Sequence, residues 1–174
     1  MKKLFSLLFV LIFLLFDSTL LVSATDRFTN HSVEIIVEED GLYTFNHVID
    51  VDFDTPSQGI YVRIPQVYNL SFTMEDGTVV NRVYRFPVSD ISRLNQQTLI
   101  WSSYEDVRIR LGTEGEYFTG KRRFTYSYTV RTRDLDLDGK QLFYFSIIGD
   151  EWELPVDRVE FKIRFPKDVS SFTK

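Results

Sequence analysis

Residues 121–131 read KRRFTYSYTVR, and apolar and polar side chains alternate along this stretch. Phe124, Tyr126, Tyr128 and Val130 would all point to one side of an extended chain, because successive side chains of a strand lie on opposite faces. An unbroken two-residue period over this length predicts a β-strand in a sheet that buries one face.

The same period recurs from Thr25 onward, and turn residues separate the apolar stretches. Asp40-Gly41 is a two-residue hairpin signal, and Pro65 ends a ladder because it has no N–H to donate. Residues 142–148 are apolar on both faces and predict a central strand, whereas a single helical turn is expected within 89–95.

We expect about nine or ten strands in one all-β domain. Their expected ranges are 32–39, 42–53, 59–64, 67–73, 78–88, 98–102, 107–111, 121–131, 142–148 and 159–165. Many short antiparallel strands predict an antiparallel β-sandwich, and a barrel is the alternative.

The first 24 residues have the organisation of a targeting segment. Two lysines follow Met1, residues 4–16 are almost continuously apolar, and Val22 and Ala24 have the spacing of a signal-peptidase site. The apolar run is short against the ~20 residues that a membrane-spanning helix needs. We therefore expect a cleaved signal peptide at 1–24 and an exported domain at 25–174. The alternative is an uncleaved anchor formed by residues 4–22.

Composition excludes several classes of protein. The 174-residue chain has a formal net charge of −5 and contains no cysteine. The acidic balance argues against a nucleic-acid-binding protein, which needs a concentrated basic surface. Without cysteine there are no disulfides, thiolate metal sites or cysteine nucleophiles. The one basic cluster, at residues 121–123, is expected to be a solvated strand end.

An acidic segment at residues 134–139, DLDLDG, copies the first half of a calcium-binding loop. The carboxylates concerned are those of Asp134, Asp136 and Asp138. The twelfth loop position, which should be a bidentate acid, is Phe145. An ordinary acidic turn is therefore expected, and the alternative is a calcium site completed by Asp150 or Glu151.

Signals for catalysis are weak. The chain has two histidines, His31 and His47, and we expect both to be plain polar positions within or near strands. The sequence assigns no catalytic, cofactor-binding or metal-binding residue, and the protein is not expected to be an enzyme or to need a cofactor. A hydrolase would require two carboxylates that face each other in a cleft.

Two parts of the chain carry a family resemblance. Residues 136–167 contain an acidic turn, an aromatic strand, Gly149, the Trp152–Pro155 segment and a closing strand, and residues 59–65 read GIYVRIP. This combination resembles the bacterial membrane-protein family known as domain of unknown function 2207, although Phe145 stands where the family usually has tryptophan. The resemblance implies an extracytoplasmic β domain followed by membrane-spanning helices and a cytoplasmic tail. Those helices are missing here, so a fragment or truncated copy is expected. It implies no catalytic residues.

The leading hypothesis for function is a non-catalytic extracytoplasmic domain of a membrane protein, acting as a scaffold or protein-interaction module. It would have an unknown protein or cell-envelope partner and no nucleic-acid partner. Attachment to the membrane would use an anchor beyond Lys174 or an uncleaved signal segment, and the protein would be secreted if the chain ends at Lys174. The alternative is a secreted carbohydrate-binding module. A coplanar row of exposed tyrosines would favour that alternative, and the candidates are Tyr61, Tyr68, Tyr84, Tyr104 and Tyr117.

Overall fold

The computed structural model describes residues 25–74, 76–93, 98–132, 136–137, 140–141, 144–149, 152 and 154–166. Every regular element among these residues is a β-strand, and ten of the strands have five or more residues. No helix in the described part of the chain is long and apolar enough to cross a membrane. The predicted signal peptide lies outside the described residues.

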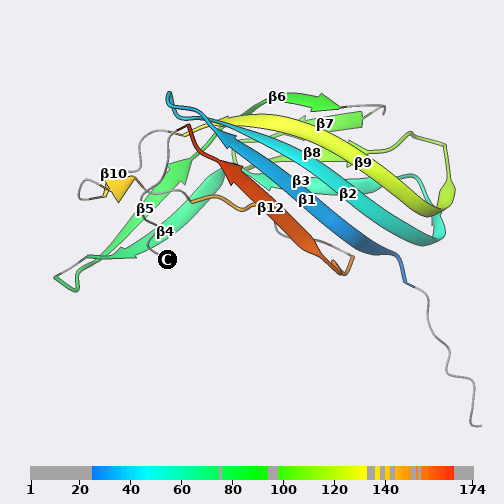
Figure 1. The fold of residues 1–174 in the computed structure, drawn as a ribbon, viewed down its shortest axis with the longest axis horizontal. Helices are drawn as coiled ribbons and strands as arrows, with labels where there is room; N and C mark the ends of the chain where they lie inside the picture. The colour runs from blue at the N-terminus through cyan, green and yellow to red at the C-terminus, as the bar shows by residue number, and fades with distance from the viewer. Residues whose placement is uncertain are drawn as a thin grey trace, which may run out of the picture.

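The larger layer is a five-stranded sheet with the order β12-β1-β2-β9-β6 (Figure 1). Its strands are β1 (Arg27–Val37), β2 (Leu42–Ser57), β6 (Val88–Arg93), β9 (Phe118–Arg131) and β12 (Val159–Arg164). The predicted turn at Asp40-Gly41 joins β1 to β2, and Gly41 has a φ of 77°. All the pairs are antiparallel except that of β12 with β1, which is parallel.

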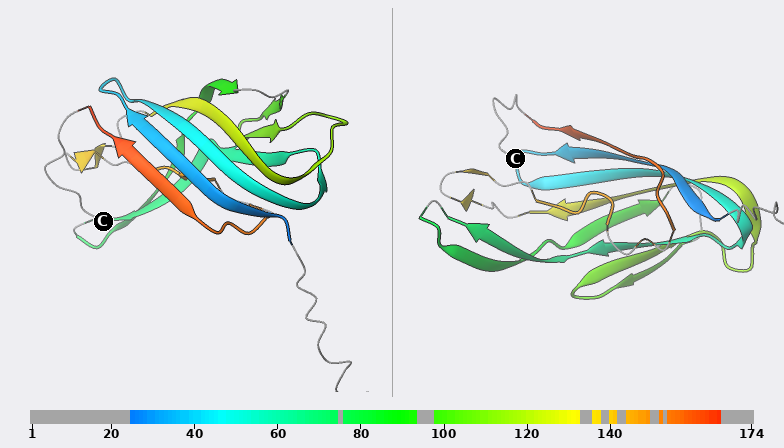
Figure 2. Two further views of the ribbon diagram at one scale, coloured as in Figure 1. Left: turned by 45° about the vertical axis from the view of Figure 1, so that its right-hand side comes forward. Right: turned by 90° about the horizontal axis from the view of Figure 1, so that it is seen from below.

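The second layer faces this sheet and is made of two smaller sheets (Figure 2, right). One is three-stranded, with the order β3-β8-β7: β3 (Ile60–Pro65), β8 (Asp106–Leu111) and β7 (Thr98–Ser102). The other is the hairpin of β4 (Val67–Thr73) and β5 (Val79–Arg85). A short hairpin, β10 (Asp136–Leu137) with β11 (Lys140–Gln141), completes the elements. The predicted all-β sandwich is confirmed.

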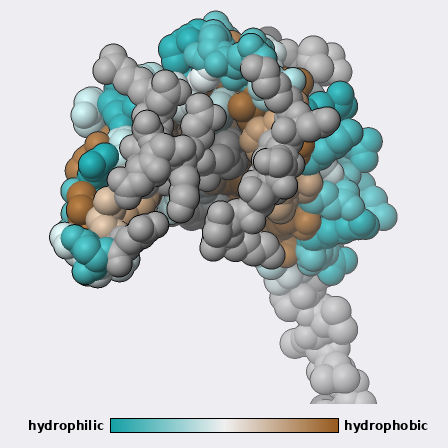
Figure 3. Space-filling view, turned by 60° about the vertical axis from the view of Figure 1, so that its left-hand side comes forward, coloured by the Kyte–Doolittle hydropathy of each residue, from teal (hydrophilic) through white to brown (hydrophobic). Residues whose placement is uncertain are grey.

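The core lies between the two layers and follows the alternation seen in the sequence. Phe124, Tyr126, Tyr128 and Val130 of β9 are buried, and apolar side chains from the second layer, such as Ile109, are buried with them. The intervening β9 residues point outward. Figure 3 shows hydrophilic residues over the outside of the main sheet and hydrophobic ones between the layers. Each sheet therefore buries one face, as a sandwich requires.

The backbone at Gly59, just before β3, lies very close to the backbone of the facing strand β8. Gly59 has a φ of 137°, and a Cβ added there would lie 2.0 Å from the Leu111 carbonyl oxygen. An L side chain rarely adopts that φ and would collide with the facing strand, so only glycine fits.

The prediction of a central strand at 142–148 is wrong over the residues described. Residues 144–149 form no strand, although Phe145 is buried. Its ring contacts Phe45 of β2, with centroids 4.6 Å apart, and Tyr68 of β4, at 5.4 Å. The segment passes between the layers without regular secondary structure. Its residues are apolar on both faces because both layers contact it, not because it is a central strand.

The prediction of a helical turn at 89–95 is also wrong for its described part. Ser89 to Arg93 belong to β6, which pairs with β9 across a register shift. The irregularity centres on Asp90, whose φ is 49° and whose carboxylate accepts a 2.7 Å hydrogen bond from the Thr129 hydroxyl. Side-chain bonds to β9 therefore replace part of the ladder and allow a polar edge strand. Residues 94–97 lie outside the described part.

The apolar face of β12 is not buried as its alternation predicts. Val159 and Phe161 lie opposite the buried residues His31 and Val33 of β1, so they are on the inner side of the sheet. They are nevertheless 42% and 58% exposed. The physical reason is position: β12 is the last strand of the wider layer, where the narrower layer does not cover its inner face (Figure 2, right).

Candidate interaction surface

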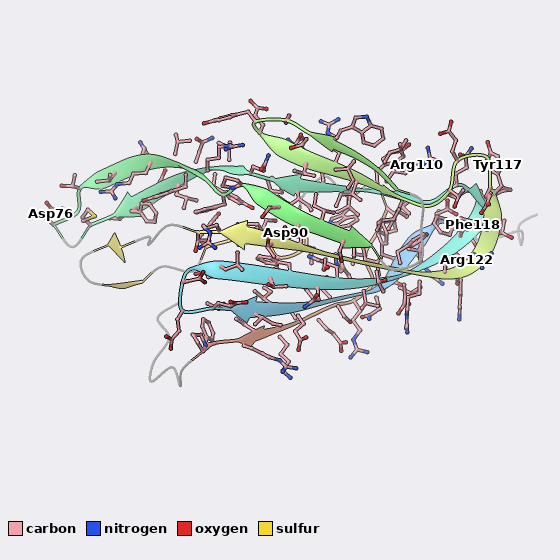
Figure 4. All side chains as sticks on the ribbon, turned by 90° about the horizontal axis from the view of Figure 1, so that it is seen from above. Asp76, Asp90, Arg110, Tyr117, Phe118 and Arg122 are labelled. Atoms are coloured by element: carbon pink, nitrogen blue, oxygen red, sulfur yellow. The ribbon has the colours of Figure 1, made fainter. Side chains whose placement is uncertain are left out.

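The outer face of the β3-β8-β7 sheet gathers aromatic and arginine side chains, and among its arginines Arg108 is the exposed one. Val62 and Ile109 of this sheet point into the core, so the alternate residues point outward. The strand registers place Tyr61 opposite Arg110 and Trp101 opposite Arg108, with β8 in the middle. Arg110 lies on this layer in Figure 4, apart from Asp90 of the main sheet. We call this set, with Leu99 beside Arg110, the β3-β8-β7 surface.

Two large rings stand over the middle strand of this surface. Tyr61 is 62% exposed and Trp101 is 48% exposed, and their ring centroids are 6.5 Å apart with an interplanar angle of 34°. Leu99, on the same face, is also exposed. Contiguous exposed apolar side chains often mark interaction sites, and tryptophan, tyrosine and arginine are enriched in the energetic centres of protein interfaces. The composition of this surface resembles that of such interface centres.

A buried carboxylate holds the arginines in place. Asp106 accepts hydrogen bonds from Arg63 Nε at 2.6 Å, Arg108 Nε at 3.2 Å and Ser103 Oγ at 2.9 Å. The Arg63 guanidinium is the largest cause of a lowered pKa of Asp106, and burial opposes it. The carboxylate therefore stays ionised and fixes the two guanidinium groups. The side chain of Arg108 remains 61% exposed and is available to a partner.

Gln66 ties the turn before β8 to the start of β6. Its amide nitrogen donates to the Ser103 carbonyl at 2.7 Å, and its Oε1 accepts from the Val88 N–H at 2.9 Å. The side chain is buried, and its amide satisfies backbone groups of two separate segments. The turn at residues 103–105 is thus linked through Gln66 to the start of β6.

Replacing Asp106 with alanine is expected to lower the free energy of unfolding by about 2 kcal/mol, because charged hydrogen-bond partners are lost in a buried site. The neighbouring Glu105→Ala variant is the control and should be near neutral, since that side chain is exposed. Chemical denaturation of both variants checks this. Equal small losses in the two variants would show that Asp106 does not organise the surface.

The two histidines are not plain polar positions, which corrects the sequence prediction. Both are buried, and His31 Nε2 lies 3.0 Å from His47 Nδ1. His47 stacks on Tyr126 at 4.4 Å, and the edge of Trp152 meets His31 at 5.4 Å. Burial lowers the pKa of His31 to about 4, and burial together with the neighbouring His31 lowers the pKa of His47 well below its ordinary value. Both imidazoles are therefore neutral at physiological pH.

A narrow crevice lies beside this pair. It is lined by His47, Val62, Arg63, Ile64, Tyr126, Tyr128, Ser146, Ile148 and Gly149. It is too tight to admit a water-sized sphere. The histidine pair therefore belongs to the packed core and does not open onto a binding pocket there.

The other residues singled out from the sequence have the following places. The basic cluster at residues 121–123 is exposed near the start of β9, so the expected solvated strand end is confirmed. Arg123 forms a bidentate pair with Asp50, at 2.6 and 2.9 Å. The Arg122 guanidinium lies over the Phe118 ring. Tyr117, Phe118 and Arg122 lie at the end of the molecule opposite to Asp76 (Figure 4). Trp152 packs edge-on against Phe28 at 4.8 Å.

The acidic turn expected at residues 134–139, and its calcium-site alternative, concern side chains that lie outside the described part of the chain. The side chains of Asp134, Asp136 and Asp138 lie outside the described residues, as do Asp150 and Glu151. Within the described part of the chain, no group of three or more histidine or acidic residues could hold a metal ion.

The five tyrosines proposed as a sugar-binding row do not share one environment. Tyr68 is buried and Tyr84 is half-buried, whereas Tyr61, Tyr104 and Tyr117 are exposed. Tyr104 lies in the turn between β7 and β8, where Arg85 stands 4.7 Å from its ring centroid. The exposed partner of Tyr61 is Trp101, which the sequence did not single out.

Fold and surface together define an all-β sandwich domain with an aromatic and arginine-rich outer face. The chain matches the family described as predicted membrane protein (DUF2207) N-terminal domain over residues 27–173, and it belongs to that family. It is thus a domain of unknown function from a predicted membrane protein, and the resemblance noted in the sequence is confirmed.

No curated protein matches the chain. Among solved structures, it is similar to an M1 zinc metallopeptidase from Deinococcus radiodurans bound to a Tyr-Ser-Ala substrate, with a TM-score of 0.36 and 9% identity over 65% of this chain and 22% of that one. A two-domain M1 zinc metallopeptidase bound to L-tryptophan gives a TM-score of 0.35 and 10% identity over 66% and 22%. The chain spans less than a quarter of the length of these enzymes. Likeness at this level supports no inference about activity.

Proposed function

We propose that this chain is a non-catalytic, extracytoplasmic docking domain of a membrane protein, and that it binds another protein through the β3-β8-β7 surface. The observation that carries the proposal is the exposed pair of Tyr61 and Trp101 beside Arg108. Membrane association is consistent with the family, and the extracytoplasmic side rests on the predicted signal peptide.

On this surface, hydrogen bonds hold side chains in place that solvent can still reach. The Asp106 and Gln66 networks hold the arginines and the adjoining turn before any partner binds. A rigid surface loses little conformational entropy on association, so more of the contact energy appears as affinity. We expect the partner to offer a pocket for the indole ring and a carboxylate for Arg108, because these are the groups that the surface leaves exposed.

The test uses the fluorescently labelled chain from Thr25 to Lys174, which contains every described residue, and isolated cell envelopes of the source organism as the probe. We expect saturable binding that disappears when the envelopes are treated with protease. Trp101→Ala should weaken binding at least tenfold, as expected for an interface centre that contributes about 2 kcal/mol or more. Tyr117→Ala, which removes an exposed aromatic ring outside this surface, should leave binding unchanged.

Two outcomes would overturn the proposal. Binding that Trp101→Ala and Tyr117→Ala weaken equally would show that the β3-β8-β7 surface is not the binding surface. Binding that survives protease, and that purified cell-envelope polysaccharide reproduces and competes with, would instead favour the carbohydrate-binding module.

A further inference from the structure

The inner face of β12 is an apolar strip at an open sheet edge. Within the described part of the chain, β12 pairs with β1 on one side and with no strand on the other. Val159 and Phe161 are exposed there, and Ile163 is half-buried beside them. An exposed apolar edge strand is a template for pairing with another chain. This strip is on the opposite layer from the β3-β8-β7 surface.

We infer that the occupant of this edge is a second copy of the chain, whose β12 pairs antiparallel with the first about a two-fold axis at Phe161. The resulting dimer would continue the main sheet of each copy into the other. It would bring six apolar side chains together on the inner face, which would cover Phe161 with its own counterpart. This goes beyond the proposed docking function, because it uses a different surface and a different partner.

The backbone sets which residues can face each other. The His31 N–H donates to the Arg158 carbonyl at 2.9 Å, so the backbone groups of Arg158 face β1. Because these groups alternate in direction along a strand, those of Val159, Phe161 and Ile163 face the open edge. When the β12 strands of two copies pair antiparallel, the residues that exchange hydrogen bonds across the edge must come from these three. Registers that would match odd-numbered with even-numbered residues are excluded.

Charge selects among the registers that keep most of β12 paired, which are those centred on residues 160, 161 and 162. With Phe161 opposite Phe161, Val159 faces Ile163, and Glu160 faces Lys162 twice on the outer side. Centring the pair on Glu160 or Lys162 would place like charges directly opposite, which destabilises a sheet. The facing arginines of the chosen register, Arg158 and Arg164, are both compensated within their own chain. Arg158 pairs with Glu160, and Arg164 pairs with Glu34 at 2.6 Å.

The first test is sedimentation of the chain from Thr25 to Lys174 over a wide concentration range. We expect a concentration-dependent dimer. Lys162→Glu alone and Glu160→Lys alone should each weaken it at least tenfold, because each places like charges across the axis. A mixture of the two variants should restore association, since every Glu–Lys pair is then complementary in the mixed dimer. These residues are exposed, and circular dichroism checks that the variants fold.

The second test uses the absence of native cysteine, so that one introduced thiol can cross-link only between chains. Phe161→Cys should form a disulfide-linked dimer readily, because directly opposed residues of a hydrogen-bonded pair have Cα atoms about 5.5 Å apart. Val159→Cys should not, because its counterpart lies four residues along the antiparallel strand.

Three results would overturn the inference. They are a monomer at every concentration, equal cross-linking of Phe161→Cys and Val159→Cys, or a variant mixture that associates no better than its components. Binding of the monomer to phosphatidylglycerol vesicles, lost in Phe161→Asp and without any dimer, would assign the strip to a lipid surface instead and would also overturn it.

Discussion

Replacing Phe145 with alanine is expected to lower the free energy of unfolding by about 3–5 kcal/mol, the range for deleting a buried phenylalanine ring. Phe145 is buried, and its ring contacts Phe45 of the main sheet, Tyr68 of β4 in the other layer, and Phe86, which follows β5. The cavity would lie between the layers, where neither sheet can move to fill it without disturbing its hydrogen bonds.

Urea denaturation of the chain from Thr25 to Lys174 measures the effect. The matched control is Phe161→Ala, the same substitution at an exposed ring, which should change the stability by about 0.5 kcal/mol or less at concentrations where the chain is monomeric. Similar losses in the two variants would mean that the irregular segment at 144–149 does not join the layers.

Acidification from pH 7 to pH 4.5 is the second large effect, and it should destabilise the domain. The folded-state pKa of His31 is depressed from an ordinary 6.5 to about 4, so the unfolded chain binds a proton that the folded chain does not. The contribution of neutral His31 to the free energy of unfolding is therefore complete above pH 6.5, and it is lost as the pH falls toward 4. The full shift corresponds to about 3 kcal/mol for His31, and His47 acts in the same direction.

The control removes both imidazoles together. The double variant His31→Leu/His47→Phe replaces the hydrogen-bonded pair with apolar side chains, so no buried polar atom of the pair is left without its partner. Unfolding measured at pH 7, 6, 5 and 4.5 should show a clearly smaller loss in the double variant. Arg63, Tyr126 and Tyr128, which line the crevice beside His47, do not change charge over this range. Parallel pH profiles of the two proteins would contradict the account.

The sequence predicts most of the strands because one-sided burial leaves a visible period. The alternation in β9 identifies Tyr126 and Tyr128 as core residues, and the structure buries both. The same logic fails for Phe145, because a segment enclosed by both layers is apolar in every direction, whatever its conformation. It fails for Phe161 as well, since alternation shows which side of a strand is apolar and not whether the opposite layer reaches it.

The histidine pair was within reach of the sequence, whereas the β3-β8-β7 surface was not. The Asp40-Gly41 turn sets a register in which His47 faces Val33 and His31 faces Ile49, so the two rings are diagonal neighbours on one face. The meeting of Tyr61 and Trp101, in contrast, depends on β8 inserting between β3 and β7. No residue pattern within these three strands indicates the order in which they pair in the sheet.

The proposed docking function requires that the outer face of the β3-β8-β7 sheet binds a protein partner. The most direct measurement places a photoreactive amino acid at position 61 or 101 of the chain in living cells and identifies what it cross-links. Positions 83 and 117, which carry exposed side chains elsewhere, are the controls. The account predicts a defined protein adduct from positions 61 and 101 that the control positions do not form. Equal adducts from all four positions, or none from 61 and 101, would contradict it.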